Sequence, residues 1–568
     1  MNKFLIISIL SAICFISCNS NKKQPKTNKD TINAHTQWVD SIYNNMSLKE
    51  KVGQLFMVAT YSNRDHKHSD AIEKLIKEFN IGGLIFFQGD PVRQAKQTNE
   101  YQTISKVPLF IGIDGEWGLN MRLDSTSKYP YNMTLGAIQK NSIVKQIAKQ
   151  IGKDCKRLGI HINFAPVVDI NTNPKNPIIG VRSFGEDKYN VTKKAVAFTE
   201  GLQSEGILAC AKHFPGHGDT DTDSHKTLPT VSFSKERIDS VELYPYKQLF
   251  NKGIAGVMVA HLNVPSLTHE KGLPSSLSPK VVTNILKEKL AFKGLIFTDA
   301  LNMKGAANYK EPGDIDLAAF KAGNDVLLFT EDAPKAISKI MEAYNTNEIT
   351  EERLSHSVKK ILAAKFNAGL NQFKPIELNN LVNDLNEDIN DDLYKEAISN
   401  AITIIKNDDA VLPLQKQSKE KIAFLKLGDG SAETFLNHIR LKTDVTDVSN
   451  LSQKKLLNEL NKYDKLIVSY HRLNSRKTNA ISNKERSLIE SLSKIHKVIL
   501  NVFASQYSLQ NLSLENIEGI IVSYENSEWA NKISAQAVFG EIDAKGKLPT
   551  SISKIYPTHY GLSILEDN

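Results

Sequence analysis

Residues 294–299, Gly294-Leu295-Ile296-Phe297-Thr298-Asp299, show the pattern that decides the fold of the first part of the chain. Their apolar side chains are continuous rather than alternating, which is typical of a parallel strand covered by helices on both faces. The run ends in Asp299, and a carboxylate is costly to bury without a partner. We therefore expect a buried strand with a functional group at its carboxyl end.

Similar runs alternate with helix-forming segments between residues 50 and 330. Eight strand–helix units favour an α/β fold of the (β/α)8 TIM-type barrel over an open doubly wound sheet, and we place this catalytic barrel at residues 37–371. The other strands are expected at Gln54–Ala59, Gly83–Phe87, Pro108–Asp114, His161–Asp169, Leu208–Phe214, Gly256–Asn263 and Asp325–Phe329.

Polar residues end several of these runs. The carboxyl ends of parallel barrel strands lie on one face, where barrel enzymes carry their active sites, so residues far apart in sequence should meet there. Any one of them can be an exposed loop residue, but their equivalent positions favour a shared site. They are Asp114, Asp169, Lys212, His213, His261 and Asp299.

A smaller α/β domain is predicted after a linker. Residues 372–395 are rich in Asn, Asp and Glu and lack a long apolar period, so we assign them to the linker and residues 396–568 to a C-terminal α/β sandwich domain. No glycine-rich fingerprint opens a helix there, so no nucleotide cofactor is expected. Its strands are expected at Ala401–Lys406, Lys421–Leu427, Lys465–Tyr470, Lys497–Phe503 and Gly519–Tyr524.

The first residues are predicted to be a targeting segment. Lys3 precedes the apolar run Phe4–Ile16, which is too short to span a hydrocarbon core of about 30 Å. Because Ser17-Cys18 resembles the end of a bacterial lipobox, residues 1–17 are expected to be a lipoprotein signal peptide, with Cys18 lipidated and residues 18–36 forming a flexible tether. The protein would then be exported and lipid-anchored to the bacterial cell envelope. The alternative is an ordinary signal peptide cleaved nearby.

Charge and cysteine content narrow the classes of function. The 568 residues carry a net charge of +8, and half of this excess lies within residues 1–30. A body with so little excess charge gives no reason to expect nucleic-acid binding. Cys155 and Cys210 lie in apolar surroundings without paired spacing and are expected to be buried free thiols.

The densest group of reactive side chains lies in residues 212–225, Lys-His-Phe-Pro-Gly-His-Gly-Asp-Thr-Asp-Thr-Asp-Ser-His. A calcium loop starting at Asp219 fails because its sixth position is Ser224 instead of Gly and its twelfth is Thr230 instead of Glu. The spacing also matches no zinc or iron motif, so no metal is expected. In an acid/base loop, Asp223 would orient and stabilise the imidazole of His225, which suits proton transfer near neutral pH. A solvated Gly- and Asp-rich loop is the remaining alternative.

Two roles are open for Asp299. A carboxylate at this strand end can attack an anomeric carbon and form a covalent glycosyl intermediate. It can also be the N-cap of a helix that begins at Ala300. Spacing alone does not decide between them.

Several ordered motifs resemble glycoside hydrolase family 3, in its β-N-acetylhexosaminidase branch. Lys212–Gly218 followed by Asp223-Ser224-His225 is similar to the acid/base loop of that branch, and Thr298–Met303 is similar to its nucleophile motif. Further matches are Ile162–Asp169, Asn176-Pro177 and Arg182–Gly185 in the barrel, and Asn407, Leu412–Leu414, Phe539-Gly540 and Gly546–Pro549 in the second domain.

The resemblance implies a role for each matching position. Asp299 would be the nucleophile, His225 the general acid/base and Asp223 its partner. The residues implied in sugar binding at the −1 subsite are Asp114, Arg122, Arg182, Lys212 and His213, with His261 as a weaker candidate beside them.

One segment departs from the branch, which shows Asp-Gln-Glu-Gly-Gly-Arg after the third strand. This chain has Asp114-Gly115-Glu116-Trp117-Gly118-Leu119, so an arginine is replaced by Leu119 and a tryptophan is added. Trp117 is expected either to stack on a sugar at a neighbouring subsite or to pack in the core.

These motifs predict a retaining exo-acting β-N-acetylhexosaminidase. It would remove terminal β-linked N-acetylglucosamine from a peptidoglycan-derived or chitin-like glycan. A phosphorylase is an alternative, because a histidine acid/base carries no fixed negative charge to repel phosphate. A β-glucosidase of the family usually takes its acid from the second domain, so the pair of Asp223 and His225 argues against that activity. A catalytically inactive carbohydrate-binding lipoprotein is disfavoured because nucleophile, acid/base and sugar-binding residues occur together.

Overall fold

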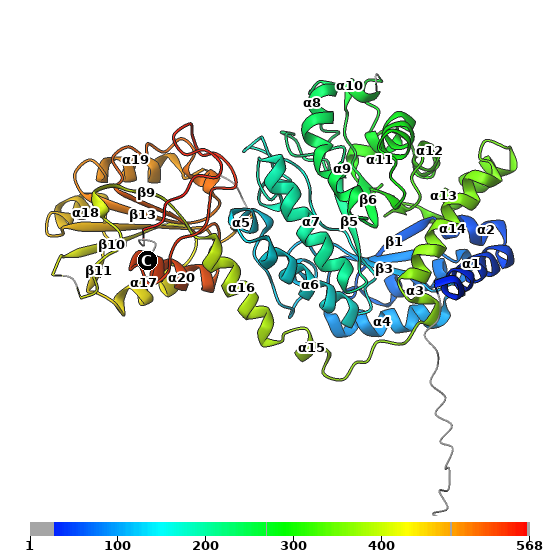
Figure 1. The fold of residues 1–568 in the computed structure, drawn as a ribbon, viewed down its shortest axis with the longest axis horizontal. Helices are drawn as coiled ribbons and strands as arrows, with labels where there is room; N and C mark the ends of the chain where they lie inside the picture. Colours follow the sequence, from blue (N-terminus) through cyan, green and yellow to red (C-terminus); the bar gives the residue numbers. More distant parts are fainter. Residues whose placement is uncertain (1–27, 269, 418, 477–479, 565–568) are drawn as a thin grey trace, which may run out of the picture.

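Eight parallel strands form a barrel in the first part of the chain (Figure 1). The computed structural model describes residues 28–268, 270–417, 419–476 and 480–564. Each strand pairs with its neighbour in chain order, and β1 pairs with β8. The strands are β1 (Phe56–Thr60), β2 (Gly83–Phe86), β3 (Phe110–Ile113), β4 (Ile162–Asn163), β5 (Leu208–Phe214), β6 (Gly256–Val259), β7 (Leu295–Thr298) and β8 (Leu327–Leu328).

The barrel closes between β7 and β8. The Thr298 N–H donates to the Val326 carbonyl at 3.0 Å, and the Leu328 N–H donates to the Thr298 hydroxyl at 2.9 Å. The TIM-type barrel expected from the continuous apolar runs is thus confirmed. β4 is much shorter than the run His161–Asp169, because Pro166 has no N–H to donate to a ladder. The rest of that run lies alongside β5 as irregular backbone.

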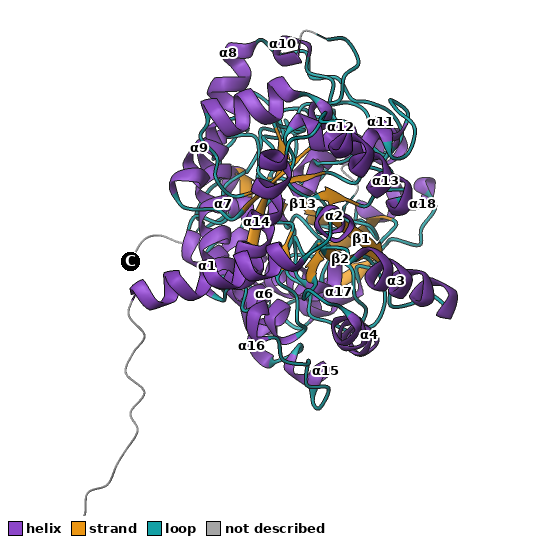
Figure 2. Cartoon of the chain, turned by 90° about the vertical axis from the view of Figure 1, so that its right-hand side faces the viewer, coloured by secondary structure: helices purple, strands orange, loops and turns teal. Residues whose placement is uncertain are grey.

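Helices surround the strands, as Figure 2 shows with helices in purple around strands in orange. In α6, Ile143, Ile147, Ile151 and Cys155 recur four residues apart and are buried, so one face of the helix lies in the hydrophobic core. The larger outer helices are α3 (His66–Phe79), α4 (Pro91–Ile104), α6 (Asn141–Arg157), α7 (Lys188–Ser204), α9 (Tyr244–Asn251), η5 (Lys280–Lys289), α12 (Asp314–Ala322), α13 (Ala333–Asn345) and α14 (Glu351–Asn367).

Helix α1 (Asn28–Asn45) begins inside the segment predicted to be a tether, so residues 28–36 are helical rather than part of a flexible tether. The helix packs on α14, where Val39 and Tyr43 are buried and Lys359 forms an ion pair with Asp40 at 2.8 Å. Cys18 and the predicted signal peptide lie outside the described residues. Within the described part of the chain, no helix is both long and apolar enough to cross a membrane.

The predicted linker, residues 372–395, contains α15 (Leu381–Asp384) and the first half of α16 (Asp388–Ala401). The segment assigned as a linker is therefore partly helical, which its composition did not predict. Leu393 and Tyr394 of α16 are buried, so the helix has an apolar face. Its many acidic residues make the segment look polar in the sequence, and the apolar face is therefore not evident there. α16 contacts α6 of the barrel and α20 of the second domain, and thereby joins the two.

The second domain contains a six-stranded sheet in the order β11-β10-β12-β13-β14-β9. Its strands are parallel except β9, which pairs antiparallel with β14. Helices α17 and α20 lie on one face and α18 and α19 on the other (Figure 1), so the predicted α/β sandwich is confirmed. The elements are β9 (Thr403–Asn407), β10 (Ile422–Gly428), α17 (Glu433–Arg440), β11 (Val445–Asp447), α18 (Gln453–Leu460), β12 (Lys465–His471), α19 (Asn483–Leu492), β13 (Lys497–Phe503), β14 (Gly519–Val522) and α20 (Glu528–Val538).

The buried carboxylate of Glu525 ties the second domain to the barrel. Its Oε1 accepts hydrogen bonds from the Thr134 hydroxyl at 2.8 Å and the Tyr131 N–H at 3.3 Å. Its Oε2 accepts one from the Tyr394 hydroxyl at 2.6 Å. Because these partners come from α5 (Asn132–Ala137), its preceding residue and α16, the contact fixes the second domain beside the loops that follow the barrel strands.

Candidate active site

The carboxyl ends of β3, β5 and β7 open into one cavity of about 260 Å3. Seven of the residues implied by the family resemblance therefore meet, as expected for strand ends on one barrel face. Among the described residues, Asp223 and His261 are not part of its lining. The polar and charged side chains that line it are Asp114, Arg122, Arg182, Lys212, His213, His217, Ser224, His225, Asp299 and Arg476.

A network of five charges forms one wall of the cavity. Lys212 Nζ lies 2.7 Å from Asp114 Oδ1 and 2.9 Å from Glu116 Oε1. Arg182 donates to Glu116 through Nη2 at 2.7 Å and Nε at 3.0 Å, and Arg122 donates to Asp114. Burial opposes ionisation of both carboxyls, but the adjacent cations hold the pKa values of Asp114 and Glu116 well below their ordinary values. Both carboxylates therefore stay charged and fix the positions of the three cations.

His213 is oriented by two neighbours. Its Nδ1 lies 2.7 Å from the buried carboxylate of Asp169, and its Nε2 lies 3.2 Å from Arg182 Nη2. Nδ1 donates its proton to Asp169, and the two contacts together fix the orientation of the ring.

Asp299 follows β7 directly and lies at the edge of the cavity. Its N–H donates to the Val259 carbonyl at 2.9 Å, and its Oδ1 accepts from the Ala300 N–H at 2.8 Å. Burial raises the pKa of Asp299, but the imidazoles of His213 and His261 and the Ala300 N–H outweigh it, so the pKa lies below its ordinary value. The carboxylate is thus ionised at neutral pH. The helix-capping alternative finds no support, because α11 (Lys304–Ala307) begins five residues later with Met303 at its N-cap.

His261 lies beneath the turn that carries Asp299. It is fully buried, with Nδ1 2.7 Å from the Ser276 hydroxyl and Nε2 3.0 Å from the Ala300 carbonyl oxygen. Since a carbonyl only accepts, Nε2 carries the proton. His261 therefore holds the residue next to Asp299 and is not positioned to touch a sugar in this cavity.

The loop after β5 is anchored by His217. Its N–H donates to Asp169 Oδ1 at 2.7 Å, Nδ1 lies 2.7 Å from the Thr220 hydroxyl, and Nε2 lies 3.2 Å from the Ser224 hydroxyl. Burial lowers the pKa of His217 to about 4, so it is neutral at physiological pH. A Cβ on Gly218 would lie 1.9 Å from the Ile170 carbonyl oxygen, so only glycine allows this close approach.

The tip of the loop carries His225, whose side chain is 61% exposed. Asp223 Oδ1 accepts from the His225 N–H at 2.8 Å and lies 2.8 Å from His225 Nδ1. This contact assigns the Nδ1 proton to the bond with Asp223 and leaves Nε2 without a partner among the described residues. In the described part of the chain, no group of three or more His, Cys, Asp or Glu side chains is arranged to hold a metal ion.

Asp169 was expected at this face as a strand end, whereas Glu116, His217, Ser224 and Arg476 lie outside the predicted set. Glu116 comes two residues after the predicted strand end at Asp114, and His217 and Ser224 lie within the dense motif, which are signals that could have found them. Arg476 comes from a loop of the second domain, and no local pattern marks it. Trp117 is 4% exposed and packs edge-on against Tyr131 with ring centroids 5.1 Å apart, so it is a packing residue rather than a sugar platform. Cys155 and Cys210 are buried free thiols, as predicted.

Comparison with known proteins gives consistent matches. A family model described as the glycosyl hydrolase family 3 N terminal domain matches residues 47–364. Beta-hexosaminidase A of Pseudoalteromonas piscicida is 33% identical over 380 residues, a match that covers 61% of this chain and 63% of that protein, just under two thirds of its length. Beta-hexosaminidase LpqI of Mycobacterium tuberculosis is 30% identical over 332 residues, covering 56% of this chain and 83% of that protein.

Solved structures show the same architecture. A glycoside hydrolase family 3 beta-N-acetylglucosaminidase from Paenibacillus sp. str. FPU-7 is 29% identical with a TM-score of 0.74, and the match covers 89% of this chain and 99% of that one. Beta-glucoside phosphorylase BglX is 22% identical with a TM-score of 0.79, covering 91% and 95% of the two chains, which shows a shared fold alone. The barrel, the sandwich domain and the family model, which matches more than half of the chain, agree: this chain belongs to glycosyl hydrolase family 3.

Proposed function

We propose that this protein is a retaining exo-acting β-N-acetylhexosaminidase that hydrolyses terminal β-linked N-acetylglucosamine. The observation that carries the proposal is one cavity lined both by the ionised carboxylate of Asp299 and by His225, whose partner is Asp223. A carboxylate nucleophile and a separate proton donor are the two groups that a retaining glycosidase needs. The names of the matched hexosaminidases supply the sugar class.

In the first step, the Asp299 carboxylate attacks the anomeric carbon. The bond to the leaving oxygen breaks while His225 Nε2 gives that oxygen a proton, and a glycosyl ester forms on Asp299. Asp223, which binds Nδ1, stabilises the charged imidazole before this transfer. In the second step, His225 takes a proton from water, the water oxygen attacks the anomeric carbon, and Asp299 is released. Two inversions give net retention.

The cavity size supports exo action. Its volume of about 260 Å3 is small, since pockets for drug-sized ligands hold roughly 300–1,000 Å3. The wall formed by Asp114, Arg122 and Lys212 provides charged groups for the hydroxyls of a single terminal sugar. Arg476 is the contribution of the described second-domain residues to the lining, and an arginine cannot serve as the acid of a β-glucosidase-type site.

Trapping the intermediate tests this mechanism. A fluorinated N-acetylglucosaminyl donor followed by peptide mapping should place the sugar on the peptide that contains Asp299. Asp299→Asn should lose about three or more decades in rate, each decade being about 1.4 kcal/mol. Asp332→Asn, a surface N-cap of α13, is the matched control and should keep full activity. An oxazoline product, or a loss under tenfold in Asp299→Asn, would contradict the proposal and point to attack by the substrate's own acetamide.

The same assay with and without phosphate separates hydrolysis from phosphorolysis. Free N-acetylglucosamine is the expected product under both conditions. Formation of N-acetylglucosamine 1-phosphate would favour the phosphorylase alternative. No turnover of any aryl glycoside by the wild-type protein would favour the inactive carbohydrate-binding alternative.

The proposal includes export and anchoring to the bacterial envelope through a lipid on Cys18. Its support is the sequence of residues 1–18 alone, because these lie outside the described residues. An anchored enzyme would act on glycans at the envelope, where peptidoglycan fragments or chitin-like chains reach it.

A further inference from the structure

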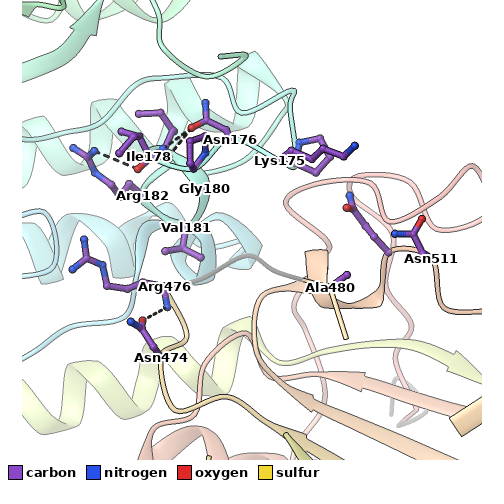
Figure 3. A pocket seen from close by; sticks show the side chains of 14 residues that line it. Lys175, Asn176, Ile178, Gly180, Val181, Arg182, Asn474, Arg476, Ala480 and Asn511 are labelled. Atoms are coloured by element: carbon purple, nitrogen blue, oxygen red, sulfur yellow. Dashed lines mark hydrogen bonds between the residues drawn. The ribbon is translucent and has the colours of Figure 1, made fainter. Parts of the chain in front are cut away.

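A second cavity of about 690 Å3 lies beside the active-site cavity, between residues 174–182 of the barrel and the second domain (Figure 3). The side chains of Pro177, Ile178, Arg182 and Arg476 line both cavities. The two spaces therefore adjoin. A substrate whose terminal sugar occupies the first cavity would extend its leaving group toward the second.

The charged residues in the described lining of this second cavity are all cationic. Three cations line it, and none of its described lining residues is Asp or Glu. The other polar residues are amides, which can bind uncharged groups as well. The charged and amide side chains are Lys175, Arg182, Arg476, Asn176, Asn474, Gln510 and Asn511.

Arg476 is the cation best placed to bind a ligand. Arg182 is engaged with Glu116, whereas no carboxylate within the described ranges lies within ion-pair distance of the Arg476 guanidinium. Arg476 is exposed and extends to the same side as Arg182 in Figure 3. A free guanidinium at the junction of two cavities suits a carboxylate, which it can bind with two parallel hydrogen bonds.

Trp117 positions this arginine. The Arg476 guanidinium lies 4.9 Å from the centroid of the Trp117 ring. The backbone N–H of Arg476 donates to Asn474 Oδ1 at 3.1 Å. Trp117 is itself held by Tyr131 and belongs to the segment that departs from the hexosaminidase branch. The added tryptophan thus gives a second-domain residue a defined place beside the active site.

We propose that Arg476, held by Trp117, binds a carboxylate on the leaving-group side of the scissile bond. The preferred substrates are then β-N-acetylglucosaminides whose next sugar is acidic. This proposal rests on the proposed hexosaminidase activity and specifies its substrate class. Lys175 and Arg182 add to the positive potential that attracts the acidic unit.

The test compares two disaccharides with the same leaving oxygen. They are N-acetylglucosaminyl-β-1,4-N-acetylmuramic acid and the methyl ester of its carboxylate, and the readout is the ratio of their kcat/KM values. The wild-type protein should prefer the acid by about tenfold or more at low salt, as a charge-assisted hydrogen bond allows, and less at high salt. Using a ratio cancels any general loss of activity in a variant.

Arg476→Gln should bring the ratio close to one, and Trp117→Leu should lower it at least threefold. Arg440→Gln, at the end of α17, is the matched control and should keep the wild-type ratio. Equal kcat/KM for acid and ester in the wild type would refute the proposal while leaving the hydrolase activity intact. Hydrolysis of neither disaccharide, with turnover of no aryl glycoside, would refute both. Phosphate-dependent release of a sugar 1-phosphate that requires Arg476 would reassign the residue to phosphate and overturn the proposal.

Discussion

Replacing Glu116 by Gln tests whether the charge network holds the sugar-binding side chains in place. Glu116 is fully buried and pairs with both Lys212 and Arg182. The substitution keeps the shape of the side chain but removes its charge. With Asp114 and Arg122 included, the network of two carboxylates and three cations then changes from a net charge of +1 to +2.

The expected loss is large because the charge is buried. At an effective dielectric constant of about 20, one ion pair at the 2.9 Å between Lys212 and Glu116 has a Coulomb energy of roughly 6 kcal/mol before desolvation. Removing one partner of a buried pair typically costs about 3–5 kcal/mol, since the other charge stays buried. Lys212 retains Asp114, so we expect about 3 kcal/mol of lost unfolding free energy. Misplacement of Lys212 and Arg182 should also lower kcat/KM by about a hundredfold.

Chemical denaturation and kinetics with an aryl N-acetylglucosaminide measure the two effects. Glu200→Gln is the matched control, because Glu200 pairs with Lys145 at the same 2.9 Å on the surface between α6 and α7. It should change stability by less than 1 kcal/mol and leave kcat/KM unchanged. If Glu116→Gln is no more destabilising than Glu200→Gln, or its kcat/KM stays within threefold of wild type, the role assigned to the network is refuted.

Three further predictions follow from single residues. His225→Ala should lose more activity on substrates with basic leaving groups than on activated aryl glycosides, because proton donation matters most for a basic oxygen; equal losses would show that His225 is not the acid. The unfolding free energy should fall as pH drops from about 6.5 toward 4, because the unfolded chain protonates His217 while the fold keeps it neutral, by up to about 3 kcal/mol. His217→Gln should make this pH dependence of the unfolding free energy shallower, and an unchanged dependence would contradict the assignment. Cys18→Ser should release the protein from membranes, since only acyl chains would hold it; retention after a salt wash would show that the anchor is not a lipid on Cys18.

The architecture could be predicted from the sequence because buried parallel strands are continuous apolar runs. The run at Leu208–Phe214 matched its strand, and so did Lys497–Phe503. β11 (Val445–Asp447) was missed, since it is short, contains Thr and Asp, and is not fully buried. α16 was missed because its acidic residues dominate the composition, while the few apolar residues that decide its packing are spread along one face.

The active site could be predicted where its residues occupy strand ends or a dense motif. Asp114, Lys212, His213 and Asp299 fall under that rule, and the cavity contains all four. Arg476 does not, because its place depends on how the second domain docks, and docking rests on contacts such as the one between Asn171 and Tyr507 at 2.7 Å. A single sequence shows neither the docking of the second domain nor the contacts that hold it there.

The two proposed catalytic residues, Asp299 and His225, are held with different rigidity, and the difference suits their roles. Asp299 is fixed by the end of β7, by the Val259 carbonyl and by the turn that His261 holds from below. A nucleophile must meet one carbon along one line, so rigid support favours it. His225 stands on a loop anchored through His217 and Ser224 but is itself held only by Asp223 among the described residues. An acid that first serves a departing sugar oxygen and then an incoming water benefits from such freedom, because the two oxygens do not occupy the same point.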